Sequence, residues 1–371
     1  MNRKFFISFF FFALILILVS LQFIFQPFKL VGLSGSYTKF NSPEFSFSAF
    51  TKGNYQKKVD YYATTSTPFR GDLVRLKNQI GYTLFNEINT NLILGKENYL
   101  FDPNYTNAFT GKDLFSHKIQ QQWEKDIQQL SEITQENGII PIFIIAPNKS
   151  RYFESHLPQV HKKGKTNQEV LAKMLLNHGI NVFNVDDWFM LLKNKVPYPL
   201  IPPHGAHWSD YGVALVSDSL NQLLQKSFNG IPEVTIGPIE VSNKAKGIDG
   251  DYLPSLNLIQ KFDSPLELAY PQMIYSKGKK LNTLVLSDSF MWNLFRNDFF
   301  KAHCKASSLF SYYNNATYNL DKERINETAI NFKANQLKQF EVLIIIATGP
   351  SIKEGFAYSL FNAEERGGLN E

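Results

Sequence analysis

The sequence predicts a doubly wound α/β domain with a mostly parallel sheet, beginning at about residue 65. Three stretches, 139–145, 283–286 and 341–347, are almost continuously apolar or β-branched, as strands buried on both faces of a parallel sheet are. An amphipathic helical pattern from Asp113 and an Asn-Gly turn precede the first stretch, and this order forms the αβ half of a βαβ unit. About five alternating elements of this kind follow one another, which is why we expect the doubly wound arrangement.

The other elements are predicted from periodicity, caps and turn residues. In the first part of the chain we expect a linker at 31–65, a helix opening at Pro68, two short strands within 91–101, the helix from Asp113 and the strand 139–145. There follow a helix at 168–177, a strand at 181–185, a short helix from Asp186, a proline-rich loop at 196–203 and a helix ending near Gln225. A stretch rich in Gly, Pro and Asn predicts a small strand insertion at about 229–280, followed by strands at 283–286, 307–313 and 341–347 and a helix at about 323–337. Residues 66–371 would form one catalytic domain that carries this insertion.

The N-terminal segment predicts a single membrane anchor. Phe5 to Phe25 is a run of 21 residues broken by only three polar ones, and as a helix it would be about 31 Å long, enough to cross the hydrocarbon core. Arg3 and Lys4 precede it, so the positive-inside rule places residues 1–30 as a cytoplasmic tip and transmembrane helix. The alternative is a cleaved signal peptide, but the apolar run is long for one and no small-x-small site lies directly behind it. We therefore expect a single-pass protein of the cytoplasmic membrane with its catalytic domain on the extracytoplasmic, periplasmic side.

Composition excludes several classes of function. The chain has 371 residues, of which 44% are hydrophobic, with 38 basic and 33 acidic residues. The first 30 residues hold three of the basic ones and no acid, so the remainder carries 35 basic against 33 acidic residues. This near-neutral balance, without a dense basic run, predicts no nucleic-acid partner. Cys304 is the only cysteine, which rules out an internal disulfide and a cysteine-based metal cage, and we expect neither a metal nor a cofactor.

Ser289 is the candidate nucleophile. The strand at 283–286 ends in Ser287-Asp288-Ser289, and the aromatic and apolar residues 290–295 predict a following helix. A serine on a tight strand-to-helix turn projects its hydroxyl from the carboxyl edge of the sheet, beside backbone N–H groups that can stabilise an oxyanion. The alternative interpretation is that Asp288 and Ser289 only cap the next helix.

His207 is the candidate general base for this serine. It lies about eighty residues earlier, within residues 203–212, just before a helix whose expected N-cap is Ser209. A serine hydroxyl is weakly acidic and needs a neighbouring base, for which histidine is the usual residue. A histidine in a loop at the mouth of a helix can face a serine on a neighbouring loop.

Polar residues directly after the strand 139–145 are further candidates, because sites of α/β sheets collect at this edge. Asn148 is a possible second oxyanion donor, and Lys149, Asp288, Trp208 and Tyr313 are possible oxyanion or substrate contacts. A plain surface loop is the alternative for 146–152. Several aromatic residues could stack on sugar rings, with core packing as the alternative role for each: Trp208, Tyr211, Tyr252 and Tyr313.

Six motifs together resemble one family. They are PFRGDLVRLKNQIGYTLFN, GKENYLF, IIAPNKSRYFESHLP, HWSDYG, GDYLPSLNL and VLSDSF, in this order over roughly residues 68–350. The combination resembles the alginate O-acetyltransferase type of SGNH-hydrolase-like proteins, which are membrane-anchored or secreted and acetylate exported polysaccharides. The resemblance implies an SGNH-hydrolase-like fold with a permuted motif order and a Ser–His–Asp triad, in which Ser289 is the nucleophile and His207 the base.

One position departs from the family pattern. The family's aspartate lies two residues before its histidine, where this chain has Gly205. Three other carboxylates are candidates to orient His207, and the sequence does not rank Asp187, Asp249 and Asp251. Otherwise a dyad operates at lower efficiency, or activity is lost; a missing orienter can reduce the rate by up to about ten-thousandfold.

The resemblance implies that an acetyl group moves through a serine acyl-enzyme onto hydroxyls of an exported polysaccharide. Acetyl-CoA is not available outside the cytoplasm, so a multipass membrane acyltransferase is the implied acetyl donor. The first alternative is a carbohydrate esterase that uses the same serine and histidine with water as acceptor. The second is a catalytically silent polysaccharide-binding or assembly subunit, for which Gly205 is the best support.

Overall fold

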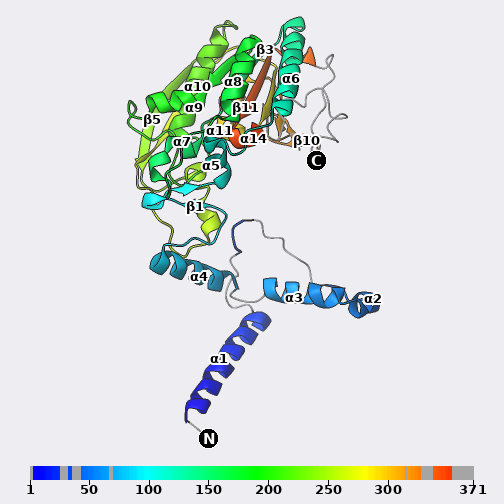
Figure 1. The fold of residues 1–371 in the computed structure, drawn as a ribbon, viewed down its shortest axis with the longest axis vertical. Helices are drawn as coiled ribbons and strands as arrows, with labels where there is room; N and C mark the ends of the chain where they lie inside the picture. The colour runs from blue at the N-terminus through cyan, green and yellow to red at the C-terminus, as the bar shows by residue number, and fades with distance from the viewer. Residues whose placement is uncertain are drawn as a thin grey trace. The chain divides into compact units, whose positions relative to one another are not determined.

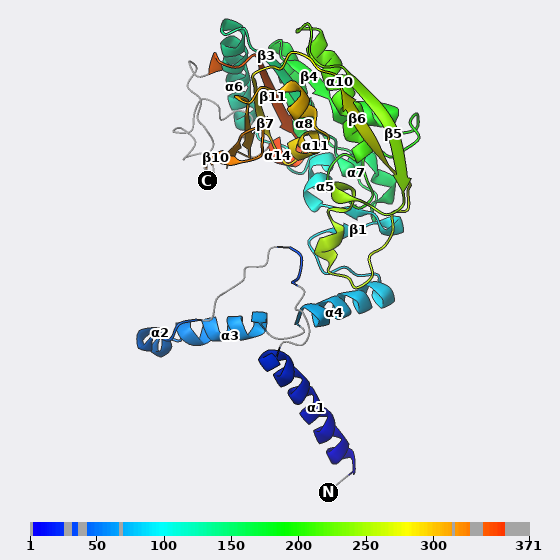
Figure 2. The same cartoon turned by 180° about the vertical axis from the view of Figure 1, so that it is seen from behind.

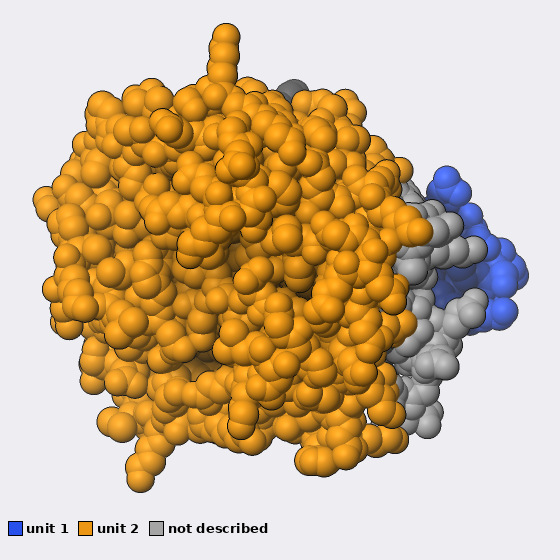
Figure 3. Space-filling model, turned by 90° about the horizontal axis from the view of Figure 1, so that it is seen from above, with its two compact units in different colours: residues 1–90, 252–262 blue, residues 91–251, 263–371 orange. Residues whose placement is uncertain are grey.

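The computed structural model describes residues 3–25, 32–35, 43–66, 70–313, 316–326 and 337–352. Contacts divide the chain into two units, coloured separately in Figure 3. Unit 1 comprises residues 1–90 and 252–262, and unit 2 comprises 91–251 and 263–371.

Unit 1 is helical. Its elements are α1 (Arg3–Phe25), α2 (Phe47–Thr51), α3 (Asn54–Ser66), α4 (Arg70–Phe85) and the 3-10 turn η4 (Leu253–Leu256). Asn78 of α4 donates from Nδ2 to the carbonyl of Leu256 at 3.0 Å, which ties the 252–262 segment to this helix. The expected linker therefore contains two helices, α2 and α3. Among the described residues, no helix combines the length and the apolar character that a membrane crossing requires.

Unit 2 contains the central sheet. Its first elements are β1 (Ile93–Leu94), η1 (Lys96–Asn98), β2 (Leu100–Phe101), α5 (Pro103–Thr110), α6 (His117–Glu136), β3 (Ile140–Ile145), α7 (Lys149–Tyr152), η2 (Glu154–His156), α8 (Asn167–Asn177), β4 (Asn181–Asn184), α9 (Val185–Leu192) and α10 (Asp210–Gln225). There follow β5 (Val234–Ser242), η3 (Gly247–Gly250), β6 (Leu268–Tyr275), β7 (Thr283–Ser287), α11 (Met291–Arg296), α12 (Phe299–His303), β8 (Leu309–Tyr312), β9 (Ala316–Tyr318), β10 (Arg324–Asn326), β11 (Val342–Ala347) and α14 (Gly349–Ile352).

Seven strands form the sheet in the order β10-β9-β8-β7-β11-β3-β4. The pairs from β8 to β4 are parallel, and β9 and β10 add an antiparallel edge. The prediction of an α/β fold with a mostly parallel central sheet is therefore confirmed. In the insertion, β5 and β6 pair as an antiparallel ribbon, as expected.

Helices cover both faces of the sheet (Figures 1 and 2). Alternate residues of the buried strands enter different cores, because side chains point to opposite faces along a strand. Ile144 of β3 packs in the core that holds residues of α9, α10 and α11, whereas Phe143 packs in the core that holds residues of α6 and α8. This arrangement is the doubly wound one.

The helix expected at about 323–337 is wrong at its start. Residues Arg324–Asn326 form β10, which pairs with β9 and makes the outer edge of the sheet. The remainder of the expected helix, 327–336, lies outside the described residues. A three-residue edge strand in which Arg324 and Ile325 are both exposed carries too few apolar positions to show a strand period.

Candidate active site

Ser289 lies on the turn between β7 and α11. All five residues of β7 are buried between β11 and β8, and the strand ends two residues before the serine. Within the described part of the chain, the backbone N–H of Ser289 donates to no protein acceptor. An unused N–H beside the hydroxyl is the donor that an oxyanion at this serine needs.

Asp288 fixes this turn from behind. Its Oδ1 accepts from the Phe290 N–H at 3.0 Å, and its Oδ2 accepts from the Thr348 N–H at 2.8 Å and from the Ser351 hydroxyl at 2.6 Å. Burial raises the pKa of Asp288, and these hydrogen bonds act against that shift. The carboxylate therefore clamps the serine turn to the end of β11. Both oxygens of Asp288 are directed to these protein donors, in place of the predicted contact with an oxyanion or a substrate.

His207 reaches Ser289 from the loop before α10. Its Nε2 lies 2.8 Å from the Ser289 Oγ, and its ring centroid lies 4.8 Å from that of Phe290. Ser209 begins α10 as predicted: its Oγ accepts from the Gly212 N–H at 2.9 Å and donates to the Pro199 carbonyl at 2.6 Å. The cap fixes where the helix starts and so holds the histidine loop over the serine turn.

Asp251 is the carboxylate that contacts the imidazole. Its Oδ2 lies 2.7 Å from His207 Nδ1, and its Oδ1 accepts from the Ala206 N–H at 2.9 Å. A carboxylate on Nδ1 selects the tautomer with the proton on that nitrogen, which leaves Nε2 free to accept a proton from Ser289. The side chains of His207 and Asp251 are 14% and 28% exposed, so the chain of three side chains opens to solvent.

Gly205 occupies its position because the Asp251 segment packs directly on it. A Cβ at residue 205 would lie 2.4 Å from the carbonyl oxygen of Ile248, 2.9 Å from Pro202 Cγ and 3.2 Å from the carbonyl carbon of Asp249. Backbone cannot yield at such distances as a flexible side chain would. The close approach that brings Asp251 to His207 therefore excludes a side chain, including a carboxylate, at residue 205.

The other two orienting candidates lie elsewhere. Asp249 is fully buried and accepts from the Asp210 N–H at 3.2 Å, and burial together with the charge of Asp251 raises its pKa well above the ordinary value. Asp187 pairs with Arg151 at 2.7 Å and accepts from Asn184 Nδ2 at 2.7 Å. No contact joins either carboxylate to His207 in the described residues.

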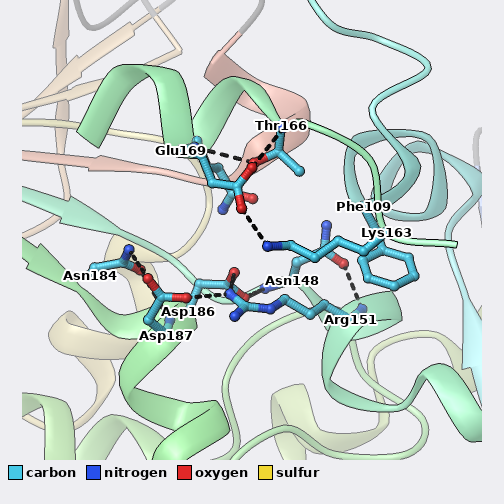
Figure 4. A pocket seen from close by; sticks show the side chains of 10 residues that line it. Phe109, Asn148, Arg151, Lys163, Thr166, Glu169, Asn184, Asp186 and Asp187 are labelled. Atoms are coloured by element: carbon cyan, nitrogen blue, oxygen red, sulfur yellow. Dashed lines mark hydrogen bonds and ion pairs between the residues drawn. The ribbon is translucent and has the colours of Figure 1, made fainter. Parts of the chain in front are cut away.

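Asp187 belongs instead to a small polar cavity (Figure 4). The cavity measures about 20 Å³, which suits water better than a sugar. Ion pairs join the side chains around it: Arg151 to Asp186 at 2.5 Å and to Asp187, and Lys163 to Glu169. Ser289, His207 and Asp251 do not line this cavity.

Asn148 is engaged as a helix cap. Its Oδ1 accepts from the Arg151 N–H at 3.1 Å, its Nδ2 donates to the Tyr105 carbonyl at 2.9 Å, and its own N–H donates to Asp186 at 2.7 Å. These bonds hold the start of α7 and leave the predicted role of Asn148 as an oxyanion donor without a contact that supports it.

Lys149 is buried and turned toward the histidine loop. Its Nζ donates to the carbonyls of Pro203 at 2.8 Å and Gly205 at 2.7 Å. The ammonium is thereby directed to backbone, in place of the predicted oxyanion or substrate contact.

The candidate aromatic residues divide between core and surface. Trp208 is fully buried, 5.0 Å from Phe290 between ring centroids, and no face of its ring is exposed for the predicted substrate contact. Tyr211 is also buried, and Tyr252 belongs to unit 1. Tyr313 is half-buried; its N–H donates to the Ser287 carbonyl at 3.1 Å, and its ring lies 4.6 Å from Tyr312.

Cys304 is buried, which raises its pKa to about 12 and removes it as a nucleophile.

Comparisons with known proteins give likenesses among solved structures. No protein-family model matches the sequence, and no curated protein matches it. The O-acetyltransferase domain of Pseudomonas putida AlgJ is 11% identical with a TM-score of 0.43, over 70% of this chain and 91% of that one. Pseudomonas aeruginosa AlgX is 9% identical with a TM-score of 0.43, over 72% and 65%, and Bacillus cereus PatB1 with a sulfonyl adduct is 11% identical with a TM-score of 0.47, over 73% and 98%. Because identity is this low, no residue role is transferred from these proteins.

Proposed function

We propose that this chain is a serine acyltransferase that moves an acetyl group onto hydroxyls of a polysaccharide. The observation that carries the proposal is the continuous chain from Ser289 Oγ to His207 Nε2 at 2.8 Å and from His207 Nδ1 to Asp251 Oδ2 at 2.7 Å. A nucleophile, a base and an orienting carboxylate in this order are the parts that nucleophilic acyl transfer requires.

In the first half-reaction, Ser289 Oγ attacks the acyl carbonyl of the donor while His207 Nε2 takes the hydroxyl proton. The resulting imidazolium is stabilised by Asp251, and the oxyanion accepts from the Ser289 N–H. Collapse of the tetrahedral intermediate breaks the bond to the leaving group, which receives the proton from His207. The products are the deacylated donor and an acyl ester of Ser289.

In the second half-reaction, His207 removes the proton from an acceptor hydroxyl, whose oxygen attacks the ester of Ser289. The acyl group leaves on the acceptor, and Ser289 regains its proton from His207. With water in place of the sugar, the same steps describe the esterase alternative.

Two features support a sugar acceptor. The six motifs in their order resemble the alginate O-acetyltransferase type of family. In addition, half-buried aromatic rings lie beside the serine turn. The backbone N–H of Trp292 donates to the Ser289 carbonyl at 3.2 Å. The ring centroid of Trp292 lies 5.6 Å from that of Tyr312 and 5.1 Å from that of Tyr318. Aromatic surfaces of this kind suit the apolar faces of sugar rings.

The proposal includes a membrane anchor and an extracytoplasmic location. Its support is the sequence run from Phe5 to Phe25 behind two basic residues. A domain placed there needs an acetyl donor other than acetyl-CoA, and a multipass membrane acyltransferase is the donor we propose.

Removal of the nucleophile tests the proposal. Purified full-length protein is given p-nitrophenyl acetate and an oligosaccharide, and acetate release and acetyl transfer are both measured. We expect Ser289→Ala to abolish both, and Ser287→Ala, a buried serine two residues earlier, to retain both. The proposal fails if Ser289→Ala retains activity. Wild-type release without any transfer favours the esterase, and absence of both in the wild type favours the silent subunit.

A further inference from the structure

Lys149 sits at one end of a hydrogen-bond path that leads to the triad, which comprises Ser289, His207 and Asp251. The Gly205 carbonyl accepts from Lys149 Nζ at 2.7 Å, and the Ala206 N–H donates to Asp251 Oδ1 at 2.9 Å. These two groups belong to one peptide unit. In a trans peptide they point in opposite directions, so holding the carbonyl on one side aims the N–H at the other.

We infer that Lys149 is a positioning residue for the triad, acting on Asp251 through the Gly205–Ala206 peptide group. The inference rests on the proposed function, since it concerns the carboxylate that orients His207. Fixing the plane of this peptide fixes the Ala206 N–H, and that N–H holds the second oxygen of the Asp251 carboxylate while the first contacts His207.

The surroundings of Lys149 hold its Nζ in one place. The side chain is 1% exposed, follows the Asn148 cap at the start of α7 and has the Phe101 ring 5.8 Å from Nζ. Burial lowers the pKa of Lys149 well below its usual value, and the charges of Asp251 and Asp249 oppose that shift. The distances of 2.7 and 2.8 Å to the two carbonyls are those of charge-assisted hydrogen bonds.

A positive charge at this end of the path also has an electrostatic consequence. A charged donor on the carbonyl polarises the peptide and strengthens the N–H as a donor, because hydrogen bonds in a chain polarise one another. Asp251 then shares its charge between the N–H and the imidazole. Without Lys149, the Ala206 N–H is a weaker and less fixed donor, so the carboxylate that orients His207 is held less firmly.

Lys149→Met tests this role by removing the charge with little change in length. Using p-nitrophenyl acetate, we expect kcat to fall about a hundredfold, as for a misplaced catalytic group, with KM nearly unchanged. We also expect Lys149→Gln, which retains a donor for the Gly205 carbonyl, to keep a kcat about tenfold above that of Lys149→Met. Lys193→Met is the matched control, since Lys193 is half-buried and donates to the Tyr152 carbonyl outside the path; its kcat and KM should stay at wild-type values.

A purely structural role gives a different result. If Lys149 only fills space beneath the loop, Lys149→Met and Lys149→Gln lose the same activity or none; either outcome overturns the inference. If Lys149→Met does not fold, Lys149→Leu takes its place in the comparison with Lys149→Gln. An inactive wild type would refute the proposed function itself, whereas an active wild type with an unchanged kcat in Lys149→Met refutes only the role of Lys149.

The unmodified protein offers an independent measurement. Lys149 is the one lysine that is fully buried among the described residues, so its ammonium protons should exchange slowly with water. With 15N-labelled lysine we expect one protected ammonium signal near neutral pH. Absence of that signal would contradict a charged Lys149 and overturn the inference.

Discussion

At the residue scale, Asp251 shows how the orienting carboxylate of the proposed site can come from a different part of the chain. The family pattern places this group two residues before the histidine, and Gly205 stands there. The structure supplies the contact from a residue 44 positions after His207. The glycine at 205 and the aspartate at 251 depend on each other, because the backbone beside Asp251 occupies the space that a Cβ at residue 205 would need.

Asp251→Asn should reduce kcat by up to about ten-thousandfold with the fold intact. An asparagine can retain the contact but presents an N–H to Nδ1, which favours the unproductive tautomer of His207. Steady-state kinetics with p-nitrophenyl acetate measure the loss. A loss below about tenfold would show that His207 and Ser289 work as a dyad.

Moving the aspartate to the family position should not restore activity. In Gly205→Asp with Asp251→Asn, the new Cβ would approach the Ile248 carbonyl to 2.4 Å, so the 247–251 segment must move away. We expect this double variant to melt several degrees below Asp251→Asn and to be no more active. Recovery of activity above that of Asp251→Asn would contradict the packing argument.

At the scale of elements, the sequence predicts the strands from β8 to β4 and fails at the edge formed by β9 and β10. The strands β3, β7 and β11 are buried on both faces. Their continuous apolar sequences predict this burial. α6 follows from its helical period. β9 and β10 have three residues each, too few for any period to appear.

The candidate site likewise contains residues that the sequence predicts and residues that it does not. Ser289 and His207 were predicted because local turns place them at one edge, and the structure brings them within 2.8 Å. Asp251 was not separable from Asp187 and Asp249, since only the packing of η3 on Gly205 distinguishes them. The contacts of Lys149 with the Pro203 carbonyl and of Asp288 with the Thr348 N–H have no sequence signal, because the partners are distant in the chain.

Glu341 joins two strands at their start and should make stability depend on pH. Burial raises its pKa, but bonds from Lys305, the Asn282 N–H and Lys279 outweigh burial and lower the pKa to about 2. A folded-state pKa below the unfolded value stabilises the fold above about pH 4.5, and this contribution is lost as pH falls toward 2.

Glu341→Gln should therefore lower the melting temperature at pH 7 and make less difference near pH 3. Thermal unfolding followed by circular dichroism at both pH values measures the effect. Because the carboxylate is partly exposed, we expect a loss of about 1 kcal/mol or less at pH 7. Equal losses at both pH values would contradict the assigned ion pairs.

At the scale of the whole molecule, the proposed anchor decides where the chemistry takes place. The full chain should remain with membranes after alkaline carbonate extraction, and removal of residues 1–30 should release it. A protease added to intact cells with a permeable outer layer should digest the catalytic domain. Release of the full chain by carbonate, or protection from protease, would contradict the proposed anchor or the proposed side of the membrane.

The acyl-enzyme is the most direct test of the account. The protein is mixed with p-nitrophenyl acetate, quenched in acid within the first turnover and digested, and the peptides are analysed by mass spectrometry. We predict one acetyl group on Ser289 that disappears when an oligosaccharide acceptor is added before the quench. An acetyl group on another residue, or no acetylated peptide while the ester is consumed, would contradict the account.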